Sequence, residues 1–133
     1  MAEIYTLFFI ATITLLGVLT QHFSNVIVRG VSFAMQKNRP ADFADGALAR
    51  AGNALRNGIE SGMMMAPFVL ILLFTDTSTG LSRLAALVYV VSRSAYHVFY
   101  IAGVPLARSS TWLISIIAIV ATGVTAFGAL AAM

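Results

Sequence analysis

Four long, continuously apolar stretches constrain this chain more than any other feature of its sequence. They cover about residues 4–28, 47–74, 81–104 and 109–131. Each holds the roughly 20 residues that an α-helix needs to cross a hydrocarbon core of about 30 Å. Apolar residues run continuously through them and do not alternate with polar ones, which argues against a membrane β-barrel. The sequence therefore predicts an all-α membrane protein.

The connections between the last three stretches are short and contain turn-forming residues. Residues 75–80 read Thr-Asp-Thr-Ser-Thr-Gly, and Gly103-Val104-Pro105 follows the third stretch. Such residues cap helices and form turns. Short connections force consecutive helices to pack antiparallel. We therefore expect a four-transmembrane-helix antiparallel bundle that forms one domain over residues 1–133.

The composition indicates that lipid is the natural solvent of the chain. Hydrophobic residues make up 59% of the 133 residues and charged residues only 10%, whereas soluble domains carry about 25% charged residues. The chain has no cysteine, which excludes disulfides, thiolate zinc sites and cysteine nucleophiles. Isolated histidines do not form a metal site, so we expect no metal. Eight basic residues spread over several turns are too few and too scattered to predict nucleic-acid binding.

Basic residues are unevenly distributed between the two predicted sides of the membrane. One side has only Arg83. The other side has Arg29, Lys37, Arg39, Arg50 and Arg108. The positive-inside rule then places the long first connection and the third connection in the cytoplasm, with both termini outside.

The second and third stretches carry polar and ionisable residues at depths from which lipid would exclude them. The second stretch has four at spacings of 3, 4 and 3, which places them on one helical face: Arg50, Asn53, Asn57 and Glu60. The third stretch has Arg93, Tyr96, His97 and Tyr100. A charge at the bilayer centre costs about 2.5–3.5 kcal/mol, so such residues usually face a bundle interior and mark function. We expect His97 to be structural or to support the residues that bind the ligand.

Glu60 and Arg93 have similar predicted depths. Glu60 lies about 13 residues, or roughly 20 Å, from the cytoplasmic start of its helix. Arg93 lies about 11 residues, or roughly 16 Å, from the cytoplasmic end of the antiparallel third helix. Because a single buried charge without a partner is unfavourable, we predict an ion pair between Glu60 and Arg93.

The polar faces have two possible explanations. Polar side chains can hold membrane helices or subunits together. That role does not require arginines to outnumber carboxylates, however. The surplus of cations favours a site for an anionic ligand that enters from the cytoplasmic side.

Two segments carry a more specific pattern. Residues 49–60 read Ala-Arg-Ala-Gly-Asn-Ala-Leu-Arg-Asn-Gly-Ile-Glu. Residues 92–105 are followed by Arg108-Ser109 and Trp112. The former segment resembles the second-helix signature Arg-x-x-Arg-Ala-x-x-Asn-x-x-Glu of the MAPEG family, the membrane-associated proteins in eicosanoid and glutathione metabolism. The latter is similar to that family's third helix and the start of its fourth. The resemblance covers essentially the whole chain and agrees with the short bacterial members.

The resemblance implies a homotrimer in the bacterial inner membrane, with glutathione as thiol co-substrate bound between neighbouring subunits. It implies transferase or peroxidase activity on lipophilic electrophiles, with a hydrophobic small-molecule substrate arriving through the membrane lipid. Arg108 would activate the thiol. Asn53 replaces the arginine that is usual at its position. The implied glutathione-binding face comprises Arg50, Asn53, Asn57, Glu60, Arg93, Tyr96 and Tyr100.

Two alternatives to this enzyme remain open. A MAPEG-like protein without catalysis could bind an anionic ligand or stabilise a membrane complex, and Asn53 in place of arginine favours that alternative. A small multidrug transporter is also a short four-helix protein. Its membrane glutamate lies in the first helix, however, and the first stretch here has no glutamate at depth.

Overall fold

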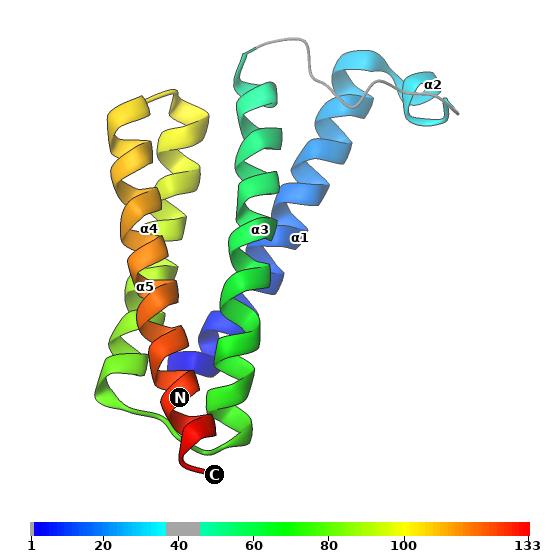
Figure 1. The fold of residues 1–133 in the computed structure, drawn as a ribbon. Coiled ribbons are helices and arrows are strands. Elements are labelled where there is room, and N and C mark those ends of the chain that lie inside the picture. The colour runs from blue at the N-terminus through cyan, green and yellow to red at the C-terminus, as the bar shows by residue number, and fades with distance from the viewer. Residues whose placement is uncertain (1, 37–45) are drawn as a thin grey trace.

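A computed structural model describes residues 2–36 and 46–133, and all regular structure within these ranges is helical (Figure 1). The helices are α1 (Ala2–Arg29), α2 (Val31–Ala34), α3 (Ala47–Phe74), α4 (Gly80–Ala102) and α5 (Pro105–Ala131). All except the short α2 are long and apolar enough to cross a membrane. The predicted architecture of four long membrane helices is confirmed for the described residues. Lys37 and Arg39, which contributed to the predicted orientation, lie outside them.

The long helices alternate in direction along the chain (Figure 1). The start of α1, the α3–α4 loop and the C-terminus lie together at one end, which we call the terminal end. The end of α1, the start of α3 and the α4–α5 turn lie at the other end. We call this the basic end, because it carries Arg29, Arg50 and Arg108.

The α4–α5 turn is tighter than the sequence indicated. Gly103 ends α4 in the left-handed conformation, with a φ of 76°, which costs glycine less than any other residue. Pro105 then occupies the first turn of α5, where its missing N–H would have had no helical partner anyway. The last helix consequently begins at residue 105 rather than at the predicted residue 109. Arg108 is therefore part of α5.

The apolar core lies in the half of the bundle nearer the terminal end. Its two clusters of buried side chains are Met65, Val69, Tyr89, Ala118 and Ile119, and, further along α3 and α5, Leu72, Ala126 and Ala129. Lipid tails are as apolar as these side chains, so van der Waals packing holds the helices together here rather than exclusion of water.

Two glycines bring α1 and α3 close together. A Cβ atom added to Gly17 would lie 2.6 Å from Cδ1 of Leu55, and one added to Gly62 would lie 2.7 Å from Cγ2 of Ile10. Real Cβ atoms do not approach that closely, so only glycine fits without a shift of the neighbour. The α1–α3 contact therefore depends on small residues, as is common between membrane helices.

A buried carboxylate at the terminal end connects α1 to two other segments. Glu3 has no exposed surface and accepts hydrogen bonds from the hydroxyl groups of Ser78 and Ser82, each at 2.7 Å. Ser82 also completes a capping box with Thr79 at the start of α4. These bonds join α1 to the α3–α4 loop and to α4. Toward the basic end, in contrast, α3 diverges from the α4–α5 pair (Figure 1).

Candidate functional site

The α4–α5 turn determines where the polar residues of these two helices meet. The N–H of Val104 donates to the carbonyl of Phe99 (3.0 Å), and the N–H of Gly103 donates to the carbonyl of Tyr100 (3.1 Å). These bonds close the last turn of α4 and direct the chain straight into α5. Tyr100 in that last turn therefore faces Arg108 in the first turn of α5. The guanidinium carbon of Arg108 lies 4.9 Å from the centre of the Tyr100 ring, within the range of a cation–π interaction.

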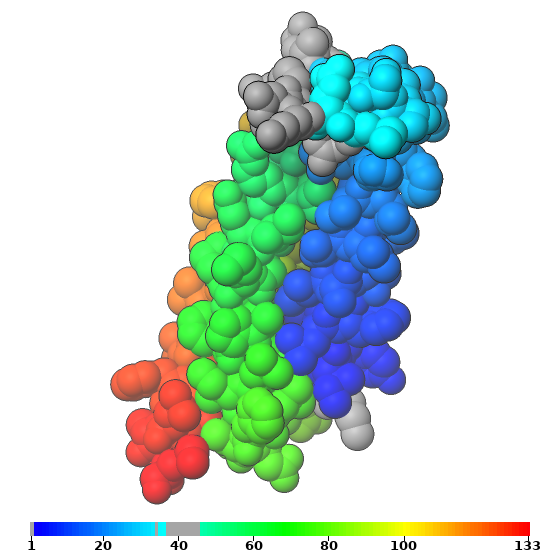
Figure 2. Space-filling view, turned by 90° about the vertical axis from the view of Figure 1, so that its right-hand side faces the viewer, coloured from blue at the N-terminus to red at the C-terminus, as the bar shows by residue number. Residues whose placement is uncertain are grey.

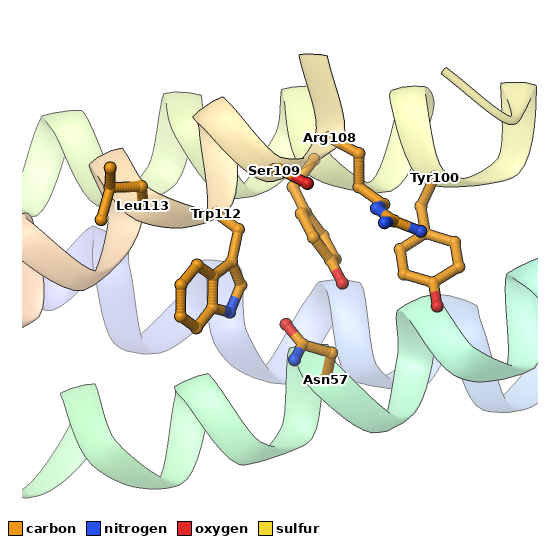
Figure 3. Close-up of a pocket in the computed structure, with 7 residues that line it drawn as sticks. Asn57, Tyr100, Arg108, Ser109, Trp112 and Leu113 are labelled. Carbon is orange, nitrogen blue, oxygen red and sulfur yellow. The ribbon is translucent and has the colours of Figure 1, made fainter. Parts of the chain in front are cut away.

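A cavity of about 490 Å³ opens between α3 and the α4–α5 pair at this level. Four of the predicted site residues line it together, joined by three further side chains of α5: Asn57, Tyr96, Tyr100, Arg108, Ser109, Trp112 and Leu113. Figure 3 shows Leu113 and Trp112 toward one end of this group and Tyr100 at the other, with Arg108 and Asn57 on opposite walls between them. The cavity thus combines a polar region around Arg108 with an apolar wall further along α5.

Arg93 is buried directly behind the cavity. Its side chain is only 1% exposed, and its two terminal nitrogens donate to Asn57, one to Oδ1 (2.9 Å) and one to the backbone carbonyl (3.0 Å). Its guanidinium carbon also lies 4.9 Å from the centre of the Tyr96 ring. The Nε atom has no hydrogen-bond partner in the described part of the chain. Arg93 therefore places a positive charge behind Asn57 and Tyr96.

The predicted ion pair between Glu60 and Arg93 is not formed. Arg93 donates to Asn57 instead, and Glu60 lies on an exposed face of α3. Depth alone suggested the ion pair, but contact also depends on how each helix is rotated. Glu60 follows Asn57 by three residues, which turns it about 60° away around the helix. Asn57 occupies the position that faces Arg93.

Arg50 lies apart from the cavity and joins α3 to the end of α4. Its Nε donates to the carbonyl of Ile101 at 2.9 Å. The carbonyl groups in the last turn of a helix lack helical partners, and the helix dipole favours a cation there. This contact stabilises the α4 end and leaves the terminal guanidinium nitrogens of Arg50 for other partners.

Asn53 and Glu60 also lie outside the cavity, on an outward face of α3 that they share with Arg56. All three side chains are exposed in the single chain. Figure 2 shows α3 uncovered along its length beside α1. Exposing Arg56 and Glu60 to lipid would be costly. This face therefore needs a polar partner.

His97 contacts both its own helix and α3. Its Nδ1 lies 2.8 Å from the carbonyl of Arg93, one turn earlier on α4. Its other nitrogen lies against Gly58, where an added Cβ atom would be 2.9 Å from it. His97 thus packs α4 closely against α3 beside the Arg93–Asn57 contact.

Two features of this structure were not among the predictions from sequence. Ser109 and Trp112 appeared only as part of a family-like segment, and Leu113 as one apolar residue among many; all three line the cavity. Their spacing from Arg108, by 1, 4 and 5 residues, was the available signal, since such residues lie close together on one side of a helix. The partners of Glu3 were not predicted either, because they lie 75 and 79 residues away in sequence.

The sequence profile of the MAPEG family matches residues 3–128. No protein of curated function matches the chain. The matched region includes every residue of the cavity and runs through the four membrane helices almost from end to end. By this match, the chain belongs to the MAPEG family.

Proposed function

We propose that this MAPEG protein is a membrane-embedded glutathione-dependent transferase or peroxidase that acts on lipophilic electrophiles. The observation that carries the proposal is the gathering of Asn57, Tyr96, Tyr100 and Arg108 around one cavity, with the buried cation of Arg93 behind it. The family includes microsomal glutathione transferases, which supports the same activity.

The charges around the cavity suit an anionic ligand. Three carboxylates are described: Glu3 is bound by serines at the terminal end, Asp76 is in the loop at that end, and Glu60 is on the outer face of α3. None of the three lines the cavity. Arg108 and Arg93 are thus left without a carboxylate there. Glutathione brings two carboxylates, which match the forked donors of arginine.

Arg108 is the residue that we expect to activate the thiol. A free thiol has a pKa of about 8.5, and only the thiolate attacks electrophiles. A cation close to the sulfur stabilises the anion and increases its fraction at neutral pH. Arg108 lines the cavity and is held over the Tyr100 ring, so its charge has a defined position.

The outer face of α3 supports a homotrimer. Arg56 and Glu60 lie one turn apart on that face and are exposed in the single chain. A second copy would bring the same pair of opposite charges and could remove both from lipid. Assembly would also bring Glu60 toward a neighbouring subunit's cavity, where its carboxylate suits the ammonium group of glutathione. Arg50 and Asn53 belong to the same proposed binding face.

The orientation and location follow from the charges. Arg29, Arg50 and Arg108 lie at the basic end, whereas Arg83 lies near the terminal end. We propose that the basic end faces the cytoplasm of a bacterium across its inner membrane. Glutathione would then enter from the cytoplasm, and the hydrophobic substrate would enter from lipid.

A second candidate function assumes the same fold without catalytic activity. Asn53 replaces an arginine, and the Nε of Arg50 is used to cap α4, so fewer cations reach the cavity than the sequence indicated. A MAPEG protein that binds an anionic ligand without turnover would fit these two observations.

Calorimetric titration and enzyme assay of the purified protein test the proposal. We expect glutathione to bind the wild type, and the wild type to conjugate it to 1-chloro-2,4-dinitrobenzene. Arg93→Ala should abolish detectable binding. Arg83→Ala is the matched control, because Arg83 is an exposed arginine near the terminal end, and it should bind as the wild type does. Equal binding by Arg93→Ala and wild type, or a wild type that neither binds nor conjugates glutathione, would refute the proposal. Binding without turnover would favour the second candidate.

A further inference from the structure

The apolar wall of the cavity is not used by the chemistry proposed for Arg108. Trp112 and Leu113 form this wall on α5. Trp112 is 40% exposed and Leu113 is 53% exposed, so neither belongs to the packed core. Figure 3 shows the indole of Trp112 beside the cavity, with its nitrogen-bearing edge turned toward the side where Asn57 lies. The indole of Trp112 thus forms part of the cavity wall.

The indole of Trp112 has no partner in the described part of the chain. The hydrogen bond from Ser115 (2.7 Å) goes to the backbone carbonyl of Trp112 and leaves the indole N–H unused. The tyrosines of the cavity differ, because Tyr96 and Tyr100 stack edge to face with their ring centres 5.4 Å apart. Trp112 therefore offers both an aromatic face and a hydrogen-bond donor to a ligand.

We infer that Trp112 selects the second substrate, a planar aromatic electrophile that stacks on the indole next to the thiol sulfur. This inference rests on the proposed function. Trp112 follows Arg108 by four residues, which is about 6 Å along the helix axis. Aromatic rings stack favourably with their centres roughly 4.5–7 Å apart. A ring stacked on the indole could therefore present a carbon atom to a sulfur held near Arg108.

The chemical step needs no further reactant. With an aryl chloride, the thiolate sulfur attacks the ring carbon that bears chlorine and forms the C–S bond. The C–Cl bond then breaks, and chloride leaves with the bonding electron pair. The thiol proton has already passed to water. The indole N–H can donate to an acceptor on the ring, such as a nitro oxygen.

A tryptophan near a helix end can instead anchor the protein at the membrane surface. Such a residue points outward to the headgroups. Trp112 lines the cavity with Asn57, a residue of a different helix. The two roles also predict different responses to an aromatic ligand.

Fluorescence quenching tests the indole surface without glutathione. Trp112 is the only tryptophan in the sequence, so all indole emission comes from it. We expect 1-chloro-2,4-dinitrobenzene to quench this emission with a saturable dependence on concentration. The matched control is the double variant Trp112→Phe/Ile117→Trp, which moves the reporter to a separate, apolar groove between α4 and α5. It should show only the linear quenching of a probe dissolved in detergent. Linear quenching of both proteins would overturn the inference.

Substrate selectivity provides a second test. We compare glutathione conjugation of 1-chloro-2,4-dinitrobenzene with that of 1-iodohexane, an aliphatic electrophile. Trp112→Leu should lower kcat/KM for the aryl substrate about three- to ten-fold more than for the aliphatic one. Trp112→Phe should retain most of the preference, and Ile117→Ala should retain all of it. Glutathione should raise the thermal stability of all three variants as it does that of the wild type.

The outcomes separate this inference from the proposed function. A wild type without glutathione binding or turnover would refute the proposed function, and the quenching experiment would still decide whether Trp112 binds aromatic ligands. Normal glutathione binding with equal losses for both electrophiles, or with no loss in Trp112→Leu, would overturn the role of Trp112 and leave the transferase proposal in place.

Discussion

Replacing Arg93 and replacing Asn57 should have different effects on the stability of the protein without ligand. Arg93 is 1% exposed and is held by two hydrogen bonds to Asn57, while its Nε has no partner in the described part of the chain. No described carboxylate pairs with it. In Arg93→Met, a buried charge is replaced by an apolar side chain of similar length. Exchange of buried ionic groups for apolar side chains is often neutral, and it stabilises a protein by about 1–4 kcal/mol where a whole ion pair is replaced, so we expect Arg93→Met to keep or raise the Tm.

Asn57→Leu should instead destabilise the protein. It removes Oδ1, which accepts one of the two bonds, and keeps the backbone carbonyl that accepts the other. One charged donor is then left buried without an acceptor, which costs about 2 kcal/mol. At roughly 4 °C per kcal/mol for a chain of this size, Tm should fall by about 8 °C. The double variant should regain most of this loss, because the charge that needed the acceptor is gone.

Thermal unfolding in detergent, with and without glutathione, measures these effects. The wild type should gain stability from glutathione, and Arg93→Met should gain none. Arg83→Met controls for the loss of an arginine as such, because Arg83 is exposed near the terminal end. If Arg93→Met unfolds at or below the Tm of Asn57→Leu without ligand, Arg93 has a structural role. Arg93 would then not be a surplus cation held ready for an anionic ligand.

Three further variants test other parts of the structure. Gly58→Ala places a Cβ atom 2.9 Å from Nε2 of His97 and should destabilise the protein by about 1–3 kcal/mol. Adding His97→Ala should restore the Tm. An unchanged Tm in the single variant would contradict this contact. Ser82→Ala removes a 2.7 Å hydrogen bond to buried Glu3 together with the capping box of α4, and chemical denaturation should show a loss of about 1–3 kcal/mol. Arg108→Ala removes the cation that we propose activates the thiol, so the pH–rate profile of conjugation should move upward by about one to three pH units. A profile that stays in place would exclude Arg108 as the activating residue.

Local chemistry explains how much of the fold could be predicted. The length and apolarity of each stretch define four membrane spans, because lipid leaves a backbone no partners outside a helix. Gly103 and Pro105 similarly mark the turn that brings the third and fourth spans together. The spacing of Arg50, Asn53, Asn57 and Glu60 placed them on one helical face, although that face is broad enough to meet different partners. These properties depend on neighbours in sequence, so the sequence alone determined them.

The tertiary structure decided which side chains meet. Asn57 rather than Glu60 faces Arg93, because the rotation of α3 against α4 is fixed by packing along both helices. Glu3 is satisfied by serines more than 70 residues away. Trp112 lines the cavity because α5, which begins at Pro105, presents the side that carries Trp112 toward α3. Helical spacing defines faces within one helix, but the orientation of each face depends on contacts with all its neighbours, and these exist only in the folded bundle.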